Sequence, residues 1–234
     1  VLEKMVRSDY SHPIDSDIFS AKSKDEIILC LNYNGLYGLN NINRLLQLNN
    51  PHPAVDIGIW RFKAGDPILF NDSGRFDVLY NNMKGRILTI QDAGERVYFT
   101  VEVDALLDQW DVLCCKGLDY ISDDGEKTQV GFSINRTKPY SSDEERATMD
   151  HIVPFQIAYA VSIHKAQGLE YDSVKIVIAD ETEEQITHNI FYTAITRAKQ
   201  CLTIYWSPEV CNSVLARIAK AMIEVALPQS VLLG

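Results

Sequence analysis

The chain has 234 residues, of which 46% are apolar, and a formal net charge of −10. This length and composition allow one large domain or two small ones with a well-packed core. The apolar runs are all shorter than the ~20 residues of a membrane-spanning helix. The first residues do not have the basic start and apolar core of a secretory signal, so we expect none. The acidic balance excludes a protein that binds nucleic acid mainly through a broad basic face.

Cysteine usage indicates a reducing compartment. The number of cysteines is odd, and three of the five lie in strand-like apolar runs; they are Cys30, Cys114, Cys115, Cys201 and Cys211. The vicinal pair is not a C-x-x-C motif and has no histidine near it, which disfavours a zinc site. We therefore expect free thiols in a cytoplasmic protein that does not associate with a membrane.

The first part of the chain changes from polar to apolar. Residues 1–24 are rich in aspartate and serine and predict an extended connector. Because the chain opens on Val1 and not on methionine, we expect an excised piece of a longer protein. Ile27–Leu31 form a continuous apolar run, which is typical of a strand buried on both faces of a parallel sheet.

A glycine-containing turn follows this strand. Asn40 or Asn41 is expected to cap a helix through Ile42, Leu45 and Leu46. A strand, a glycine turn and a helix N-terminus in this order favour a site for a phosphate or a nucleic-acid backbone.

Residues 51–149 change to short strand-like runs separated by turns. The runs are Val55–Phe62, Pro67–Phe70, Val78–Tyr80, Arg86–Ile90 and Val97–Val103, and one more hairpin is predicted from Trp110 to Ile134. Short strands at this spacing indicate a small barrel. We expect Phe70, Phe76 and Tyr80 in its core. Lys63, Lys84 and Arg86 are the candidates for a side that faces nucleic acid.

After residue 150 the pattern of a parallel α/β sheet begins. Strand-like runs at Val174–Ala179 and Cys201–Trp206 flank a helical block, and an amphipathic helix is predicted over Val210–Val225. The chain therefore predicts an α/β domain made of residues 1–50 and 150–234, with residues 51–149 inserted as a separate all-β domain.

Two blocks in the last third of the chain resemble motifs of the superfamily 1 helicases. SIHKAQGLE, from Ser162, is similar to motif V, and YTAITRAK, from Tyr192, is similar to motif VI, in the same order and with a strand between them. Ile27–Gln47 resembles the motif IV region of the RecD-like branch, and Phe62–Ile90 resembles the small barrel which that branch inserts. Residues 1–24, about 110–150 and the C-terminal tail are poorly covered.

The resemblance implies the C-terminal motor domain of a UvrD/RecD-like DNA helicase, a RecA-like parallel sheet with an inserted SH3-like barrel. It implies that Arg197 is an arginine finger which, with Gly168 and Glu170, contacts ATP. It also implies a track for single-stranded DNA made of Ser162, His164, Lys165 and Gln167. The cation usual in motif IV is missing at Asn32–Asn34, where the nearest basic residue is Arg44.

Only half of an ATPase site is present in the sequence. There is no G-x-x-x-x-G-K-[ST] phosphate loop, so we expect the fragment alone to be inactive. ATP and Mg²⁺ would be used by the full-length enzyme, whose missing N-terminal RecA-like domain is the expected partner of this one. Two alternatives stay open: an RNA helicase of the same superfamily, or a non-catalytic module that binds nucleic acid or protein.

Overall fold

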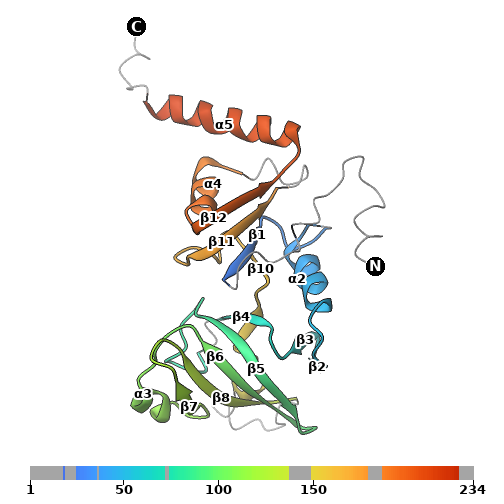
Figure 1. Cartoon of the computed structure of the whole chain (residues 1–234), viewed down its shortest axis with the longest axis vertical. Coiled ribbons are helices and arrows are strands. Elements are labelled where there is room, and N and C mark those ends of the chain that lie inside the picture. Colours follow the sequence, from blue (N-terminus) through green and yellow to red (C-terminus); the bar gives the residue numbers. More distant parts are fainter. Residues whose placement is uncertain are drawn as a thin grey trace, which may run out of the picture. The chain divides into compact units, whose positions relative to one another are not determined.

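A computed structural model describes residues 18, 25–35, 37–71, 74–136, 149–178 and 186–226. The chain divides into two compact units, shown in Figure 1. Unit 1 comprises Val1–Leu45 and Ala160–Gly234, and unit 2 comprises Leu46–Tyr159. No helix in the described part of the chain is long and apolar enough to span a membrane.

Unit 1 contains a four-stranded sheet in the order β10-β1-β11-β12, and all its strand pairs are parallel. The strands are β1 (Glu26–Cys30), β10 (Ala160–Ser162), β11 (Tyr171–Val177) and β12 (Ala198–Tyr205). The apolar run of β1 is buried from Ile27 to Cys30, as expected for a strand with neighbours on both sides. The predicted α/β class with a parallel sheet is confirmed.

Three helices of the described residues accompany this sheet. Helix α2 (Leu39–Leu48) begins in unit 1, and its residues from Leu46 belong to unit 2. Helices α4 (His188–Ile195) and α5 (Pro208–Ala226) lie entirely in unit 1. The Asn43 side chain accepts from the backbone N–H of Ala160 at 2.8 Å and donates to its carbonyl at 2.9 Å, which joins α2 to β10.

Helix α2 starts before the asparagines that were expected to cap it. The N–H groups of Leu39 and Asn40 donate to the carbonyls of Asn32 and Tyr33, at 3.0 and 3.1 Å. A Cβ at Gly38 would lie 2.3 Å from the Asn34 carbonyl oxygen, so this turn requires glycine. Backbone hydrogen bonds therefore join the glycine turn to the first residues of helix α2.

Unit 2 is mainly antiparallel. Strands β2 (Ala54–Ile57) and β3 (Trp60–Lys63) form a hairpin. A six-stranded sheet has the order β7-β8-β6-β5-β4-β9. Its strands are β4 (Pro67–Phe70), β5 (Lys84–Asp92), β6 (Arg96–Val103), β7 (Asp119–Asp123), β8 (Thr128–Asn135) and β9 (Phe155–Ile157). The helical segments are α3 (Gln109–Cys114) and η2 (Met149–His151).

The closed barrel predicted from the sequence is not found. Among the described residues no pairing joins β7 to β9, so the sheet is open at these two edges. The predicted strand at Trp110 is also wrong, because the Asp108 carboxylate accepts from the N–H groups of Trp110 and Asp111 and starts helix α3. The predicted strand at Val78–Tyr80 is a turn.

The core of unit 2 is aromatic. The rings of Phe62, Phe99 and Phe155 meet edge to face, with centroids 5.4 Å apart for Phe62–Phe155 and for Phe99–Phe155. Phe70 and Phe76 are buried as expected. Tyr80 was wrongly assigned to the core, since it is 60% exposed beside the buried Leu79.

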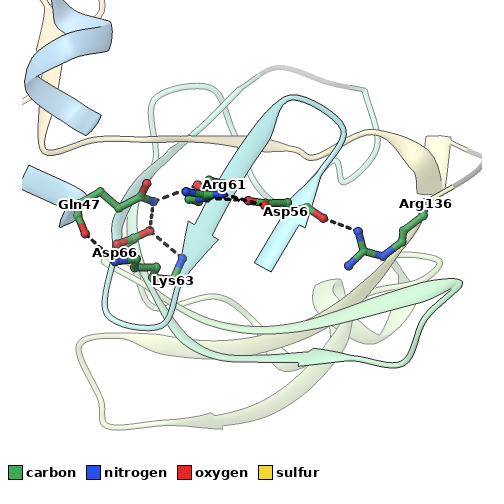
Figure 2. A network of polar contacts seen from close by, with 6 residues as sticks. All are labelled: Gln47, Asp56, Arg61, Lys63, Asp66 and Arg136. Carbon is green, nitrogen blue, oxygen red and sulfur yellow. Dashed lines mark hydrogen bonds and ion pairs between the residues drawn. The ribbon is translucent and has the colours of Figure 1, made fainter. Parts of the chain in front are cut away.

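A buried carboxylate organises the start of unit 2 (Figure 2). Asp66 is fully buried and accepts from the side chains of Gln47 at 2.6 Å, Asn50 at 2.7 Å and Tyr159 at 2.8 Å. It also accepts from the backbone N–H of Lys63 at 2.8 Å. Burial, and then the Asp66 charge, raise the pKa of the Tyr159 hydroxyl.

This network explains where the boundaries of unit 2 lie. Gln47 and Asn50 precede residue 51, and Tyr159 follows residue 149, yet all three bind Asp66. Strand β9 also pairs with β4 in the same sheet. The structural division thus falls after Leu45 and after Tyr159, where the sequence suggested residues 50 and 149.

Candidate functional site

The crossing from β10 to β11 carries the motif V residues. Ser162 ends β10 and is buried, and its hydroxyl oxygen accepts from the Lys165 N–H at 3.2 Å. The Ser162 carbonyl accepts from the Ala166 N–H at 3.1 Å, and the N–H of Leu169 donates to the Ala166 carbonyl at 3.0 Å. In this state Ser162 orders the crossing and has its side chain turned away from solvent.

The other predicted residues of the DNA track lie on the outside of this crossing. His164 and Gln167 are exposed, and Lys165 is half-buried. A ring N–H, an amide and an ammonium group are all suitable donors to phosphate oxygens. Of the four predicted residues, these three are accessible and Ser162 is not.

Gly168 lies where the crossing turns toward β11. Its φ is +84°, a left-handed conformation that favours glycine, and a Cβ built there meets nothing within 4 Å. The backbone at Gly168 is therefore open to the approach of another molecule. The neighbouring Glu170 is exposed, and its carboxylate lies 3.9 Å from the ammonium of Lys199.

Arg197 lies between the end of α4 and the start of β12. Its Nε donates to the Thr193 carbonyl at 2.9 Å, and its terminal nitrogens donate to the Leu169 carbonyl and to the Thr196 hydroxyl, both at 3.0 Å. Its own carbonyl accepts from the Tyr171 N–H at 2.9 Å. The guanidinium therefore joins the motif VI helix to the motif V crossing.

The charge of Arg197 is not neutralised within the described part of the chain. All three acceptors are uncharged oxygens, and no carboxylate there lies within ion-pair distance of the guanidinium. A guanidinium has five N–H donors, and these contacts use three of them. A half-buried cation with remaining donors can bind an anion from outside.

The strand register separates the candidate residues into two groups. Ser162 pairs with Cys30, which pairs in turn with Val177 at the end of β11. Gly168, Glu170 and Arg197 lie instead near Tyr171, where β11 begins. At ~3.3 Å per strand residue, the two levels are roughly 20 Å apart along the sheet. Of the predicted DNA contacts, Ser162 thus lies at the opposite end of the strands from the predicted nucleotide contacts.

The motif IV region offers less than the sequence suggested for phosphate binding. The first two N–H groups of α2, on Leu39 and Asn40, are already bonded to turn carbonyls. Tyr33 is 55% exposed in this turn. Arg44 lies on the exposed side of α2. The turn is therefore better suited to positioning an exposed aromatic ring than to cradling a phosphate.

Sequence reasoning missed the residues that hold Arg197. Thr193 and Thr196 lie within the motif VI block, four residues and one residue before the arginine, a spacing that a helix end brings together. Leu169 could not be found in this way, because its carbonyl is placed by the crossing between two strands.

The thiol of Cys30 is unsuited to nucleophilic chemistry. Cys30 ends β1 and is completely buried, and the burial raises the pKa of its thiol to about 12. A thiol with this pKa is not a nucleophile at neutral pH. Among the described residues, no group of three His, Cys, Asp or Glu side chains could hold a metal ion.

The segment that carries the motif V and motif VI blocks is similar to a known protein family. Residues 157–205 match the family described as the UvrD-like helicase C-terminal domain. The chain is 19% identical over 194 residues to the RecBCD enzyme subunit RecD of Buchnera aphidicola, covering 80% of this chain and 26% of that protein. The RecD subunit of Mycobacterium tuberculosis is 34% identical over 61 residues, covering 26% of this chain and 11% of its own.

Solved structures of Pif1 helicase from Bacteroides are similar as well. One, in complex with ADP-AlF3 and single-stranded DNA, has a TM-score of 0.44 at 15% identity, covering 94% of this chain and 49% of that one. The chain therefore spans only a part of the proteins that it matches. The family match falls on the segment that holds Ser162, Gly168 and Arg197, and residues 157–205 of this chain are similar to the UvrD-like helicase C-terminal domain.

Proposed function

We propose that the chain is the C-terminal motor half of an ATP-dependent DNA helicase or translocase. The observation that carries this proposal is the position of Arg197, whose guanidinium bonds to carbonyls of both the motif VI helix and the motif V crossing. Such bracing fixes the guanidinium in one orientation while its charge stays uncompensated. This is the requirement for an arginine that acts on a charge developing in a transition state.

The proposed role of Arg197 is that of an arginine finger. Phosphoryl transfer places charge on the equatorial oxygens of the transferred group, and a planar guanidinium can donate to two of them. In other nucleotide hydrolases such an arginine contributes roughly 10³–10⁵ in rate. The phosphate loop and the Mg²⁺ ligands would come from the N-terminal RecA-like domain, because this sequence has no G-x-x-x-x-G-K-[ST] motif.

Gly168 and Glu170 would complete the nucleotide contacts on this side. The left-handed Gly168 leaves its backbone open, so a nucleotide could approach closely. The Glu170 carboxylate is exposed and suits a ribose hydroxyl. Its pair with Lys199 is long, at 3.9 Å, and two exposed partners at this distance interact weakly.

His164, Lys165 and Gln167 would form part of a track for single-stranded DNA, and Ser162 would position it. Because Gly168 and Glu170 belong to the same short crossing, a shift of that crossing would move the DNA contacts and these two nucleotide contacts together. Coupling of hydrolysis to movement along DNA would then pass through the backbone between Ser162 and Arg197. Unit 2 would be the inserted, mainly antiparallel domain of this branch.

The test compares this chain with the whole protein that contains it. We expect no ATP hydrolysis by the purified chain, and hydrolysis by the whole protein that single-stranded DNA stimulates more than RNA of the same sequence. Stronger stimulation by RNA would assign an RNA helicase. Hydrolysis by the isolated chain that persists through gel filtration, or a whole protein without any nucleotide hydrolysis, would overturn the proposal.

A further inference from the structure

Unit 2 carries an exposed apolar surface that the proposed motor function does not use. Its large side chains are far more exposed than those of a core: Leu106 59%, Trp110 75%, Leu113 56% and Ile121 48%. We call this set the Trp110 surface. It lies on helix α3, the segment before it and strand β7, which stand side by side in Figure 1. Exposed apolar clusters of this kind mark interaction sites more often than scattered single residues do.

The outward direction of the Trp110 surface is fixed by the fold. On α3, Trp110 and Leu113 are three residues apart and share one face, while Val112 on the opposite face is completely buried. The Asp108 cap sets the start of the helix, and the N–H of Leu107 donates to the Thr128 hydroxyl at 2.9 Å. The helix cannot turn Trp110 inward without exposing Val112.

The surroundings of this surface are strongly acidic. From Asp104 to Lys127 the sequence has seven carboxylates and two lysines, a balance of −5 within a chain whose net charge is −10. Lys127 is already paired with Asp104 at 2.7 Å. Within the described part of the chain, neither Asp111 nor Asp119 has a lysine or arginine at ion-pair distance, and both are exposed.

We propose that the Trp110 surface docks a basic amphipathic segment of a protein partner, in which large apolar side chains are flanked by lysine or arginine. The apolar face would pack on Trp110 and Leu113, and the basic residues would meet Asp111 and Asp119. Nucleic acid is repelled by this charge, and so is a second copy of the same acidic surface. The surface lies in the part of the chain that the helicase resemblance covers poorly, and it includes none of the proposed motor residues.

The test uses a fluorescent designed helix of leucine and lysine as the probe, with fluorescence anisotropy as the measurement. We expect binding to the wild-type chain that weakens as salt is raised. The double variant Trp110→Ala/Leu113→Ala should bind about tenfold or more weakly, because exposed aromatic anchors dominate such interfaces. The variant Asp111→Lys/Asp119→Lys should lose affinity and most of the salt dependence.

A matched control is available in the same unit. Ile59 and Trp60 on the β2–β3 hairpin are also exposed, at 90% and 56%, but they lie outside the Asp104–Lys127 segment. Ile59→Ala/Trp60→Ala should therefore bind the probe within about twofold of wild type. A probe with serine in place of leucine should bind far more weakly than the amphipathic one.

A second measurement leaves Trp110, Leu113, Asp111 and Asp119 unchanged. Cys114 is exposed on the face that carries Trp110, so a bulky maleimide on Cys114 should block the probe. The Cys114→Ser variant, treated in the same way, should still bind it. Equal losses in both double-alanine variants, an unchanged Trp110→Ala/Leu113→Ala variant, or competition of the probe by single-stranded DNA would overturn the proposal.

Discussion

The two units of this chain bury their apolar residues in different ways. Unit 2 surrounds a cluster of phenylalanine rings with a six-stranded antiparallel sheet, yet it also exposes large apolar side chains such as Ile59 and Trp110. Unit 1 has a parallel sheet in which no residue of β12 is fully buried and Leu202 is 40% exposed. The candidate site residues all belong to unit 1, whereas the Trp110 surface belongs to unit 2. Each unit thus combines a buried core with a surface proposed for binding.

The units also stabilise their buried charged side chains in different ways. In unit 1, the buried Lys175 of β11 donates to the Glu26 carboxylate of β1 at 2.7 Å and to the Ile18 carbonyl at 3.2 Å. In unit 2, the buried Asp66 is surrounded by neutral donors, two amide side chains, a hydroxyl and a backbone N–H. The first arrangement depends on an ion pair and the second on a hydrogen-bond network. Mutation should therefore affect them to different extents.

The largest effect is expected at the ion pair of unit 1. Lys175→Met leaves the Glu26 carboxylate buried, with the Ser173 hydroxyl at 2.8 Å as a remaining donor. Breaking a buried pair from one side costs about 3–5 kcal/mol of unfolding free energy. Urea unfolding followed by circular dichroism measures the loss.

The matched control for this variant removes both charges. Lys175→Met/Glu26→Gln leaves no unpaired ion, so most of the lost stability should return. If Lys175→Met alone were as stable as wild type, the pair would have no structural role. Unit 1 would then not depend on an ion pair, and the proposed difference between the units would be wrong.

A smaller effect is expected at Asp66 in unit 2. Asp66→Asn keeps the shape but turns an amide N–H₂ toward groups that are themselves donors, which should cost about 1–3 kcal/mol. The exposed Asp77 provides the control, since Asp77→Asn should leave the unfolding midpoint unchanged. Equal midpoints for the two variants would show that the hydrogen bonds to Asp66 do not hold unit 2 together.

The smallest effect is expected at the β2–β3 hairpin. Arg61 donates to both carboxylate oxygens of Asp56, at 2.7 and 2.9 Å, and this hydrogen bonding lowers the pKa of Asp56. Both side chains are more than half exposed, so water and salt screen the pair. Arg61→Ala should raise the pKa of Asp56 toward its usual value in an NMR titration without a measurable shift in Tm.

The pH dependence of any stability change at the Arg61–Asp56 pair follows from the direction of the pKa shift of Asp56. A carboxyl whose pKa is lowered on folding adds stability above its unfolded pKa, and this is lost as the pH falls through the folded pKa. Any difference between Arg61→Ala and wild type should therefore appear at neutral pH and vanish in acid. A difference that grows in acid would contradict the pairing.

The parallel sheet could be predicted from the sequence because its strands are continuous apolar runs, such as Ile27–Leu31. The motif V and VI blocks indicated which residues to expect in the candidate site. The contacts of Arg197 were not predictable, since they depend on the crossing that carries Leu169 to the end of α4. The local sequence pattern does not predict such a contact between residues that are far apart in the chain.

Unit 2 was predicted less well for a related reason. Closure of a sheet depends on whether the edge strands β7 and β9 meet, and neither short strand encodes that pairing. The helix at Trp110 did have a local signal, the Asp108 cap, which the apolar run after it obscured. Tyr80 was misplaced because an apolar neighbour, Leu79, takes the buried position.

The most direct test of the account is the DNA-stimulated rate of ATP hydrolysis by the whole protein with Arg197→Ala. The proposed role predicts a fall in kcat of about 10³ or more with nucleotide affinity within about tenfold of wild type. Arg197→Lys should restore little, because a single ammonium nitrogen cannot reach the three acceptors that three different guanidinium nitrogens contact. A near-normal kcat in a folded Arg197→Ala protein would contradict the account.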